Sequence, residues 1–174
     1  DPWLEGSAFN DGWDLLSPSA KIDYSELTHV WISHEHPDHF SIIEVKRIIQ
    51  LNPRVYFLFQ KTKDRKVARF IEKLGGKVIE LTDNELFFFT DKDFIRIIRC
   101  GSTDSLALVH LGGKTIINMN DCRTGNDIEK LKEVASSLKI DALFTQFGYA
   151  SFISNKEDTA SRRNAVIDKL EKVK

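Results

Sequence analysis

Three histidines and an aspartate lie within six consecutive positions, in the run His34-Glu35-His36-Pro37-Asp38-His39. Imidazole nitrogens and carboxylate oxygens are ligands that zinc and related transition metals prefer. In an extended segment the side chains at i and i+2 point the same way, so His34 and His36 can bind one cation together. Asp38 and His39 sit at the turn into the next segment, where they can reach a second cation. The run therefore predicts a two-metal site of the kind that activates water for hydrolysis.

The elements on either side of this run must position it. The apolar stretch before it predicts a short buried strand over residues 30–33. A helix is expected to follow, with Ser41 as its N-cap and an end near Asn52-Pro53, because proline restricts the residue before it. Its apolar face is expected to consist of Ile42, Val45, Ile48 and Ile49. The metal ligands would then lie in a strand-to-helix turn.

The rest of the chain mixes strands and helices. Strands are expected at residues 55–59, 78–81, 86–89, 94–99, 106–111, 115–119 and 141–145. Helices are expected at residues 67–74, at residues 128–138 and from about Glu157 onward. Gly75-Gly76 is expected to end the first of these helices, and Gly112-Gly113 to form a tight hairpin. The pattern favours an α/β (α+β) fold in which a sheet sandwich carries helices on its outer faces.

Composition narrows the class of protein. The chain has 174 residues, of which 41% are hydrophobic and 29% are charged, as in ordinary globular domains. The formal net charge of −1 gives no electrostatic case for binding nucleic acid. No apolar run approaches the roughly 20 residues that span a bilayer, and no signal peptide is visible. With only two cysteines, we expect a reducing, cytoplasmic location. Because the sequence opens without Met, we expect residues 1–174 to be a single domain excised from a longer protein.

The histidine run matches the HxHxDH signature and resembles the metallo-β-lactamase-fold superfamily. Further stretches resemble one branch of it, namely Asp1-Pro2-Trp3-Leu4 with Ala8-Phe9-Asn10 and Gly12-Trp13, and the later Asn118-Met119-Asn120-Asp121-Cys122. That branch includes ascorbate-6-phosphate lactonase and the metallo-β-lactamase-like part of CMP-N-acetylneuraminate hydroxylase. The resemblance runs from Asp1 to about Phe152 and implies an αββα sandwich. The family fold usually needs a longer chain, so a partial or trimmed domain is expected.

The resemblance also implies further ligands. Asp121 follows a predicted strand and hairpin, where the family places the carboxylate that bridges two metals; its alternative role is to stabilise a helix N-terminus. Many members carry another histidine in the turn before the hairpin, but residues 100–105 of this chain contain none. Asp104 can substitute for that ligand or cap the turn, and both readings stay open. The family's last histidine is also missing after Asp121, and it is either replaced within residues 148–152 or lies outside this chain.

The remaining candidates are weaker. His29 is expected to make a polar contact at the end of a strand, and His110 to lie at the surface of a hairpin strand. Cys122 is expected to be a buried thiol, although a thiolate could also bind metal. With fewer ligands than the family norm, the site is expected to hold one or two zinc ions, with iron or manganese as alternatives. The resemblance implies a metal-dependent hydrolase, with Asp38 as both ligand and proton acceptor.

Its expected substrate is a small phosphorylated or sugar-derived ester, lactone or phosphodiester. Two alternatives to this hydrolase stay open. One is a catalytically weak metal-binding domain that serves a larger multidomain protein; the Cys and His pairs of a Rieske cluster are not in this sequence. The other is a nuclease of the same fold, against which the lack of excess basic charge argues. The expected partners are a small-molecule substrate and further domains, and neither a membrane nor a nucleic acid. Whether the chain is an enzyme stays open at this point.

Overall fold

The computed structural model describes residues 1–17, 21–122 and 127–145. The chain divides into two compact units, Asp1–Asp83 and Asn84–Lys174. The expected helix after Glu157 and the stretch 148–152 lie outside the described residues. Within those described, no helix has the length and apolar character needed to cross a bilayer.

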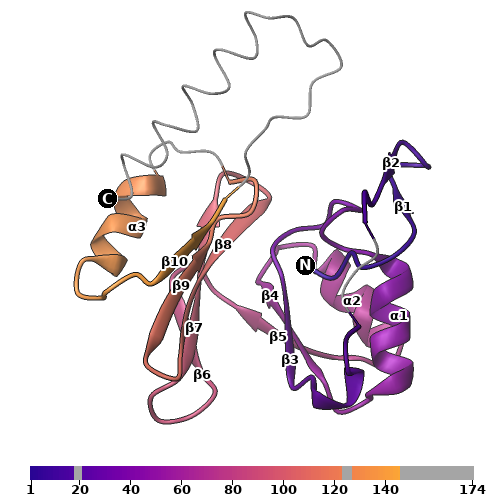
Figure 1. Ribbon diagram of the computed structural model, residues 1–174, viewed down its shortest axis with the longest axis horizontal. Coiled ribbons are helices and arrows are strands. Elements are labelled where there is room, and N and C mark those ends of the chain that lie inside the picture. The colour runs from indigo at the N-terminus through magenta and orange to yellow at the C-terminus, as the bar shows by residue number, and fades with distance from the viewer. Residues whose placement is uncertain (18–20, 123–126, 146–174) are drawn as a thin grey trace, which may run out of the picture. The chain divides into compact units, whose positions relative to one another are not determined.

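The first unit is built on a parallel sheet with the strand order β3-β4-β5. These strands are β3 (His29–Ile32), β4 (Tyr56–Gln60) and β5 (Lys77–Leu81). The crossover helices α1 (Ile42–Leu51) and α2 (Lys66–Lys73) cover the same face of the sheet (Figure 1). Parallel neighbours require such crossovers, and the strands are apolar because helices bury them.

Helix ends in this unit follow the local sequence. The Ser41 hydroxyl accepts a hydrogen bond from the Glu44 amide at 3.3 Å and so caps α1, as predicted. Gly75 takes the left-handed conformation, with φ of 85°, at the end of α2. The expected apolar face of α1 is partly wrong, because Ile42 is 45% exposed while Val45 and Ile48 are buried. The core therefore starts one turn later on this helix.

Both helices and the sheet share one hydrophobic core. Its buried members are Ile32, Phe40, Val45, Ile48, Val55, Phe57, Phe59, Val67 and Ile71. Ile32 ends β3 and Phe40 lies just before α1, so the histidine run is fixed at both ends by buried side chains. The close approach of α1 and α2 requires Gly76, since a Cβ there would lie 2.8 Å from Ile49 Cδ1.

The N-terminal segment adds structure that the sequence patterns did not predict. It forms a small antiparallel hairpin of β1 (Ser7–Ala8) and β2 (Trp13–Asp14), followed by the short helix η1 (Tyr24–Glu26). The Asn52 side-chain amide donates to the carbonyl oxygens of Tyr24 and Leu27, at 2.9 Å and 2.7 Å. These bonds tie η1 to the end of α1.

The second unit holds a five-stranded sheet in the order β10-β9-β8-β7-β6. Its strands are β6 (Glu85–Phe88), β7 (Phe94–Cys100), β8 (Asp104–Leu111), β9 (Lys114–Asn118) and β10 (Ala142–Phe144). All neighbours are antiparallel except β10, which runs parallel to β9. Gly112 and Gly113 both have positive φ and join β8 to β9 as the predicted tight hairpin. Helix α3 (Asp127–Ala135) packs on this sheet through Leu131 (Figure 1).

Each unit thus supplies one sheet with a helical layer, which is half of what an αββα sandwich contains. The predicted α/β class is confirmed, and most predicted elements occur within two residues of their expected bounds. Helix α3 ends at Ala135, three residues before its predicted end. The expectation of a single domain stays a prediction.

Candidate metal centre

The histidine run occupies the loop between β3 and α1, as the sequence predicted. The amides of His39 and Phe40 both donate to the carbonyl oxygen of His36, at 2.9 Å and 2.7 Å. These bonds curl residues 36–40 into one tight turn. The loop therefore presents its side chains from a short, rigid backbone segment.

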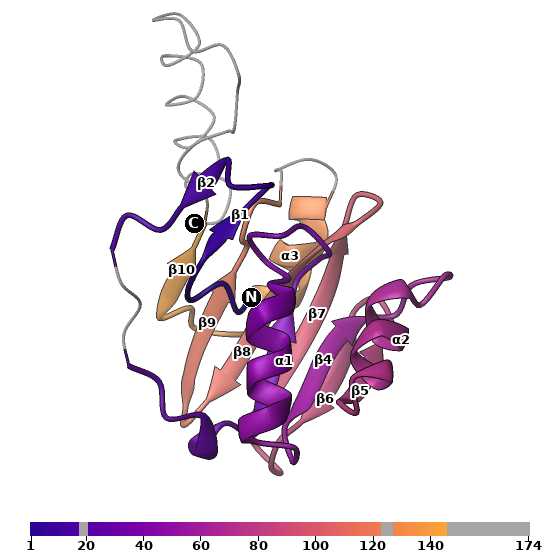
Figure 2. The same cartoon turned by 90° about the vertical axis from the view of Figure 1, so that its right-hand side faces the viewer.

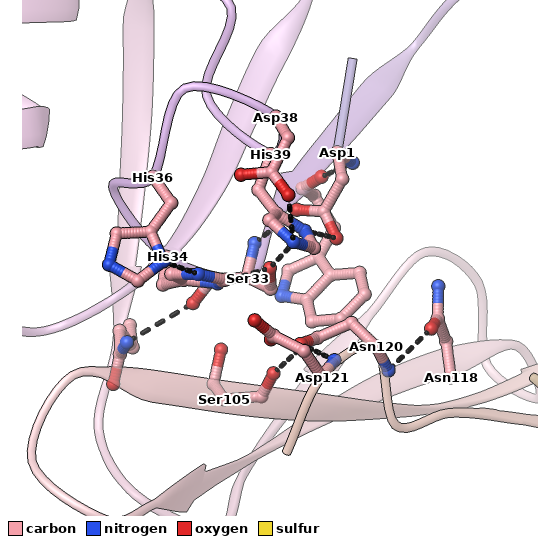
Figure 3. Close-up of polar contacts among 12 residues, drawn as sticks. Asp1, Ser33, His34, His36, Asp38, His39, Ser105, Asn118, Asn120 and Asp121 are labelled. Atoms are coloured by element: carbon pink, nitrogen blue, oxygen red, sulfur yellow. Dashed lines mark hydrogen bonds and ion pairs between the residues drawn. The ribbon is translucent and has the colours of Figure 1, made fainter. Parts of the chain in front are cut away.

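The three imidazoles are packed together (Figure 3). The ring centroid of His34 lies 4.4 Å from that of His36 and 4.2 Å from that of His39. His34 Nε2 and His36 Nδ1 face each other at 2.8 Å. Two nitrogens on one tetrahedral zinc, each at about 2.0–2.1 Å, lie roughly 3.3 Å apart, so a small opening of this pair admits the ion. Protonation of all three rings would bring like charges together, whereas metal binding uses the neutral forms.

Ser33 sets the orientation of two of these rings. It is fully buried, and its Oγ lies 3.0 Å from His34 Nδ1 and 3.4 Å from His39 Nδ1. With Nδ1 engaged in this way, His34 Nε2 faces His36 Nδ1 at 2.8 Å and His39 Nε2 faces Asp38 Oδ2 at 3.4 Å, so the Nε2 atoms point toward the other proposed ligands. Partners of this kind commonly fix the tautomer and direction of metal-binding histidines. Sequence reasoning missed Ser33, whose only signal was its position directly before the motif.

Asp1 is a second orienting group that the sequence did not reveal. Its Oδ2 lies 3.2 Å from His39 Nδ1, and its Oδ1 accepts a hydrogen bond from the Ser33 amide at 2.6 Å. The carboxylate thus joins the N-terminal segment to the end of β3 (Figure 3). When a carboxylate accepts a hydrogen bond from one imidazole nitrogen, the other nitrogen becomes a more basic metal ligand.

The contacts of the Asp38 carboxylate show whether this set of residues suits a metal ion. Its Oδ2 lies 3.4 Å from His39 Nε2, while its Oδ1 is buried and has no hydrogen-bond partner among the described residues. A buried carboxylate oxygen without a partner is costly, and a bound cation would satisfy it. Burial raises the pKa of Asp38, but the hydrogen bond and charge of His39 outweigh this and hold the pKa below its usual range. The donor set therefore fits a cation.

Replacing Ser33 with alanine is expected to weaken metal binding about 10- to 100-fold, because His34 and His39 lose a shared orienting contact. Zinc affinity measured by competition with a chromophoric chelator checks this. Ser25→Ala is a matched control, since the Ser25 hydroxyl donates a hydrogen bond to Asp23 Oδ1 at 2.6 Å. An unchanged affinity in Ser33→Ala would contradict the orienting role.

In the second unit, Asp121 follows β9 in a turn built by two asparagines. The Asn118 side chain accepts a hydrogen bond from the Asn120 amide at 2.9 Å, and Asn120 has a positive φ of 39°. The Asn120 side chain bonds the carbonyl oxygen of Ser105 on β8 and accepts from the Asp121 amide (Figure 3). The asparagines thus fix the backbone that carries Asp121 at the end of the hairpin, where the sequence analysis expected it.

Asp104 and Asp121 lie around one buried thiol. Contact with Cys100 and burial raise the pKa of Cys122, and the charges of Asp104 and Asp121 raise it further. Cys122 is fully buried, as expected, and a thiol held in its neutral form is a poor metal ligand. Asp104 is the first residue of β8 and accepts from the Thr103 hydroxyl at 3.1 Å. Its role as a ligand remains a prediction.

The remaining two histidines, His29 and His110, each contact a threonine hydroxyl. His29 Nδ1 lies 3.0 Å from Thr28 Oγ1, and burial lowers the pKa of this imidazole. His110 Nδ1 lies 2.9 Å from Thr115 Oγ1, and its ring stacks on Phe94. Both rings are engaged at positions separate from the β3–α1 loop.

The sequence of this chain is similar to part of one group of known proteins. No family model matches the chain. A curated relative is the cytidine monophosphate-N-acetylneuraminic acid hydroxylase of Xenopus laevis, which is 29% identical over 140 residues. The match covers 72% of this chain but only 23% of the hydroxylase. The chain therefore corresponds to about a quarter of that relative.

Solved structures define the fold. The CmlA β-hydroxylase E377D mutant matches 86% of this chain with a TM-score of 0.62 and 16% identity, over 35% of its own length. The metallo-β-lactamase fold protein YhfI from Bacillus subtilis matches 78% of this chain with a TM-score of 0.55 and 15% identity, over 56% of its length. This chain therefore has the metallo-β-lactamase fold. Zn²⁺-bound PqqB from Methylobacterium extorquens also matches, over 70% of this chain and 42% of its own, with a TM-score of 0.50 and 13% identity.

One of these neighbours, PqqB, is Zn²⁺-bound. The β3–α1 loop of this chain carries imidazole nitrogens and a carboxylate, a donor set that suits a metal. At these identities the solved structures establish the fold alone, and fold does not fix a substrate.

Proposed function

We propose that this chain is a metal-dependent hydrolase of a small phosphorylated or sugar-derived ester, lactone or phosphodiester. The observation that carries the proposal is the β3–α1 loop, in which three packed imidazoles adjoin a buried carboxylate oxygen that has no partner among the described residues. That oxygen costs free energy unless a cation satisfies it.

In this proposal, His34 and His36 hold one cation, and Asp38 and His39 hold a second. Asp121 is the bridging carboxylate and Asp104 a further ligand. The position of Asp121 directly after the β8–β9 hairpin supports its role, as does the asparagine turn that fixes its backbone. Zinc suits a set rich in imidazole, while the additional carboxylates leave iron or manganese as alternatives.

The bound metal would supply Lewis acidity, lowering the pKa of a water toward about 7 and polarising the bond to be cleaved. Asp38 would act as a ligand and also as a proton acceptor, and its lowered pKa keeps the carboxylate ionised. Ser33 and Asp1 would hold His34 and His39 in their binding orientation. These residues together describe a site prepared for hydrolysis.

Turnover of bis(p-nitrophenyl) phosphate by the zinc-loaded chain tests this function. We expect release of p-nitrophenol that stops when a chelator removes the zinc and returns when zinc is restored. Phenyl phosphate and a sugar lactone, tested in parallel, distinguish the diester, monoester and lactone classes. A chain that binds zinc but turns over none of the three would contradict the hydrolase proposal.

That outcome would favour a second candidate, a catalytically weak metal-binding domain within a larger multidomain protein. The specific observation behind it is that the match to the Xenopus hydroxylase spans only 23% of that protein. A domain of this kind would keep the metal for structure or for binding a neighbouring domain. Metal binding without turnover is its signature.

A further inference from the structure

Two exposed aromatic rings stand beside the histidine run. Phe9 and Trp13 lie on the β1–β2 hairpin, where they are 40% and 41% exposed. Their rings meet edge to face, with centroids 4.9 Å apart. The Phe9 ring also lies 6.4 Å from the His36 ring, at an interplanar angle of 60°. The aromatic pair therefore adjoins a proposed metal ligand directly.

The backbone that holds Phe9 in this place is strained. Phe9, Asn10 and Asp11 have φ values of 54°, 53° and 64°, three successive left-handed residues. This conformation is unfavourable for residues with a Cβ, and such strain is retained where function over-determines the geometry. The Gly12 amide donates to the carbonyl oxygen of Phe9 at 3.1 Å and closes the turn. Burial of apolar surface does not account for the turn, since the ring it presents stays exposed.

The hairpin is also anchored to α1. Glu5 pairs with Arg47, and the Gly6 backbone lies beside α1, since a Cβ added to Gly6 would lie 3.9 Å from Ile43 Cδ1. Ala8 in β1 is buried. Figure 2 shows the hairpin at the end of the first unit where α1 begins. The aromatic pair is therefore held in a defined position relative to the β3–α1 loop.

We propose that Phe9 and Trp13 form a subsite for an uncharged ring of the substrate, either aromatic or sugar, while the ester or lactone group lies at the metal. This inference rests on the proposed hydrolytic function and specifies its substrate class. Aromatic side chains bind ring faces by stacking, and indole is well suited to both ring types. Asp11 and Asp14, exposed on the same hairpin, disfavour an anionic substituent on that ring.

Nitrogen-15 NMR of the zinc-loaded chain tests the subsite at the Trp13 indole N–H, whose signal is assigned by its loss in Trp13→Leu. The probes are phenyl phosphate, glucose 6-phosphate and methyl phosphate. We expect the Trp13 signal to shift with phenyl phosphate, glucose 6-phosphate or both, and to stay in place with methyl phosphate. A response to only one of the two ring probes identifies which ring chemistry the subsite accepts.

Two substitutions complete the test. Phe9→Leu is expected to weaken the binding of the ring-bearing probe that shifts Trp13 by about five- to tenfold, without changing the binding of methyl phosphate. Tyr56→Leu is the matched control, because Tyr56 is an aromatic residue with 39% exposure that pairs with His29 in the separate β3-β4-β5 sheet. Tyr56→Leu should leave the binding of all three probes unchanged.

The results separate failure of the subsite from failure of the hydrolase. Zinc content reports on the metal centre and does not depend on a ring. If zinc binds, but no ring probe shifts the Trp13 signal more than methyl phosphate does, the subsite is refuted whichever ester or lactone class the chain hydrolyses. If zinc does not bind at all, the proposed function fails and the subsite fails with it.

Discussion

Replacing His36 with alanine is expected to lower zinc affinity by about 100-fold or more. Its Nδ1 faces His34 Nε2 at 2.8 Å, so the substitution removes one of two nitrogens that converge on the same point. The side chain is exposed, and the fold should therefore persist. Zinc affinity from chelator competition, with circular dichroism as a check on folding, measures the effect.

Glu35→Ala is the matched control for this experiment, since Glu35 is the exposed neighbour within the same motif. It should bind zinc like the unaltered chain. Equal zinc affinity in His36→Ala and Glu35→Ala would remove His36 from the ligand set, and the metal would then have to be held by other residues.

Asp38→Asn is expected to reduce kcat/KM about 10²- to 10⁴-fold for whichever ester the chain hydrolyses. The amide keeps the size of the carboxylate but cannot accept a proton at the buried Oδ1 position in the same way. His34, His36 and His39 remain, so part of the zinc should stay bound. Turnover is measured together with zinc content, which separates loss of chemistry from loss of metal.

A variant that keeps both full turnover and full zinc content would show that Asp38 is neither ligand nor proton acceptor. If Asp38→Asn loses zinc and turnover in equal proportion, Asp38 acts only as a metal ligand and not as a proton acceptor. The two observations therefore assign the role of this side chain without a structure of the complex.

Local sequence patterns predicted the elements that carry the histidine run. The apolar stretch before it forms β3, and Ser41 caps α1 as expected, because both depend on neighbouring residues. Helix periodicity misplaced Ile42, which lies in the first turn of α1 outside the core. The β1–β2 hairpin was missed because each strand has two residues, too few for any alternation to show.

The candidate site was predictable only where its residues are close in sequence. The spacing of His34, His36 and His39 is local, and their packed rings agree with the predicted cluster. Asp1 contacts His39 across 38 positions, and no periodic pattern encodes such a pairing. Ser33 was missed for another reason, since a serine before a motif is common and only the three-dimensional structure shows its two imidazole neighbours.

The resemblance supplied what the residues alone did not. Asp121 would read as an ordinary polar residue after a strand, and its proposed role depends on the family comparison. The structure adds a physical basis, because Asn118 and Asn120 build a turn with a positive φ that fixes the Asp121 backbone. The family's last histidine was expected to be either replaced within residues 148–152 or located outside this chain, and residues 148–152 are not among the described residues.

Elemental analysis of the purified chain by plasma mass spectrometry tests the central claim most directly, because it asks whether this fold holds a metal. We expect one to two equivalents of zinc, iron or manganese per chain, retained through gel filtration and lost after treatment with a chelator. Two equivalents would support the bridged pair with Asp121, and one would leave Asp104 as the next residue to substitute. A chain with no metal, even after incubation with zinc, iron and manganese salts, would contradict the account.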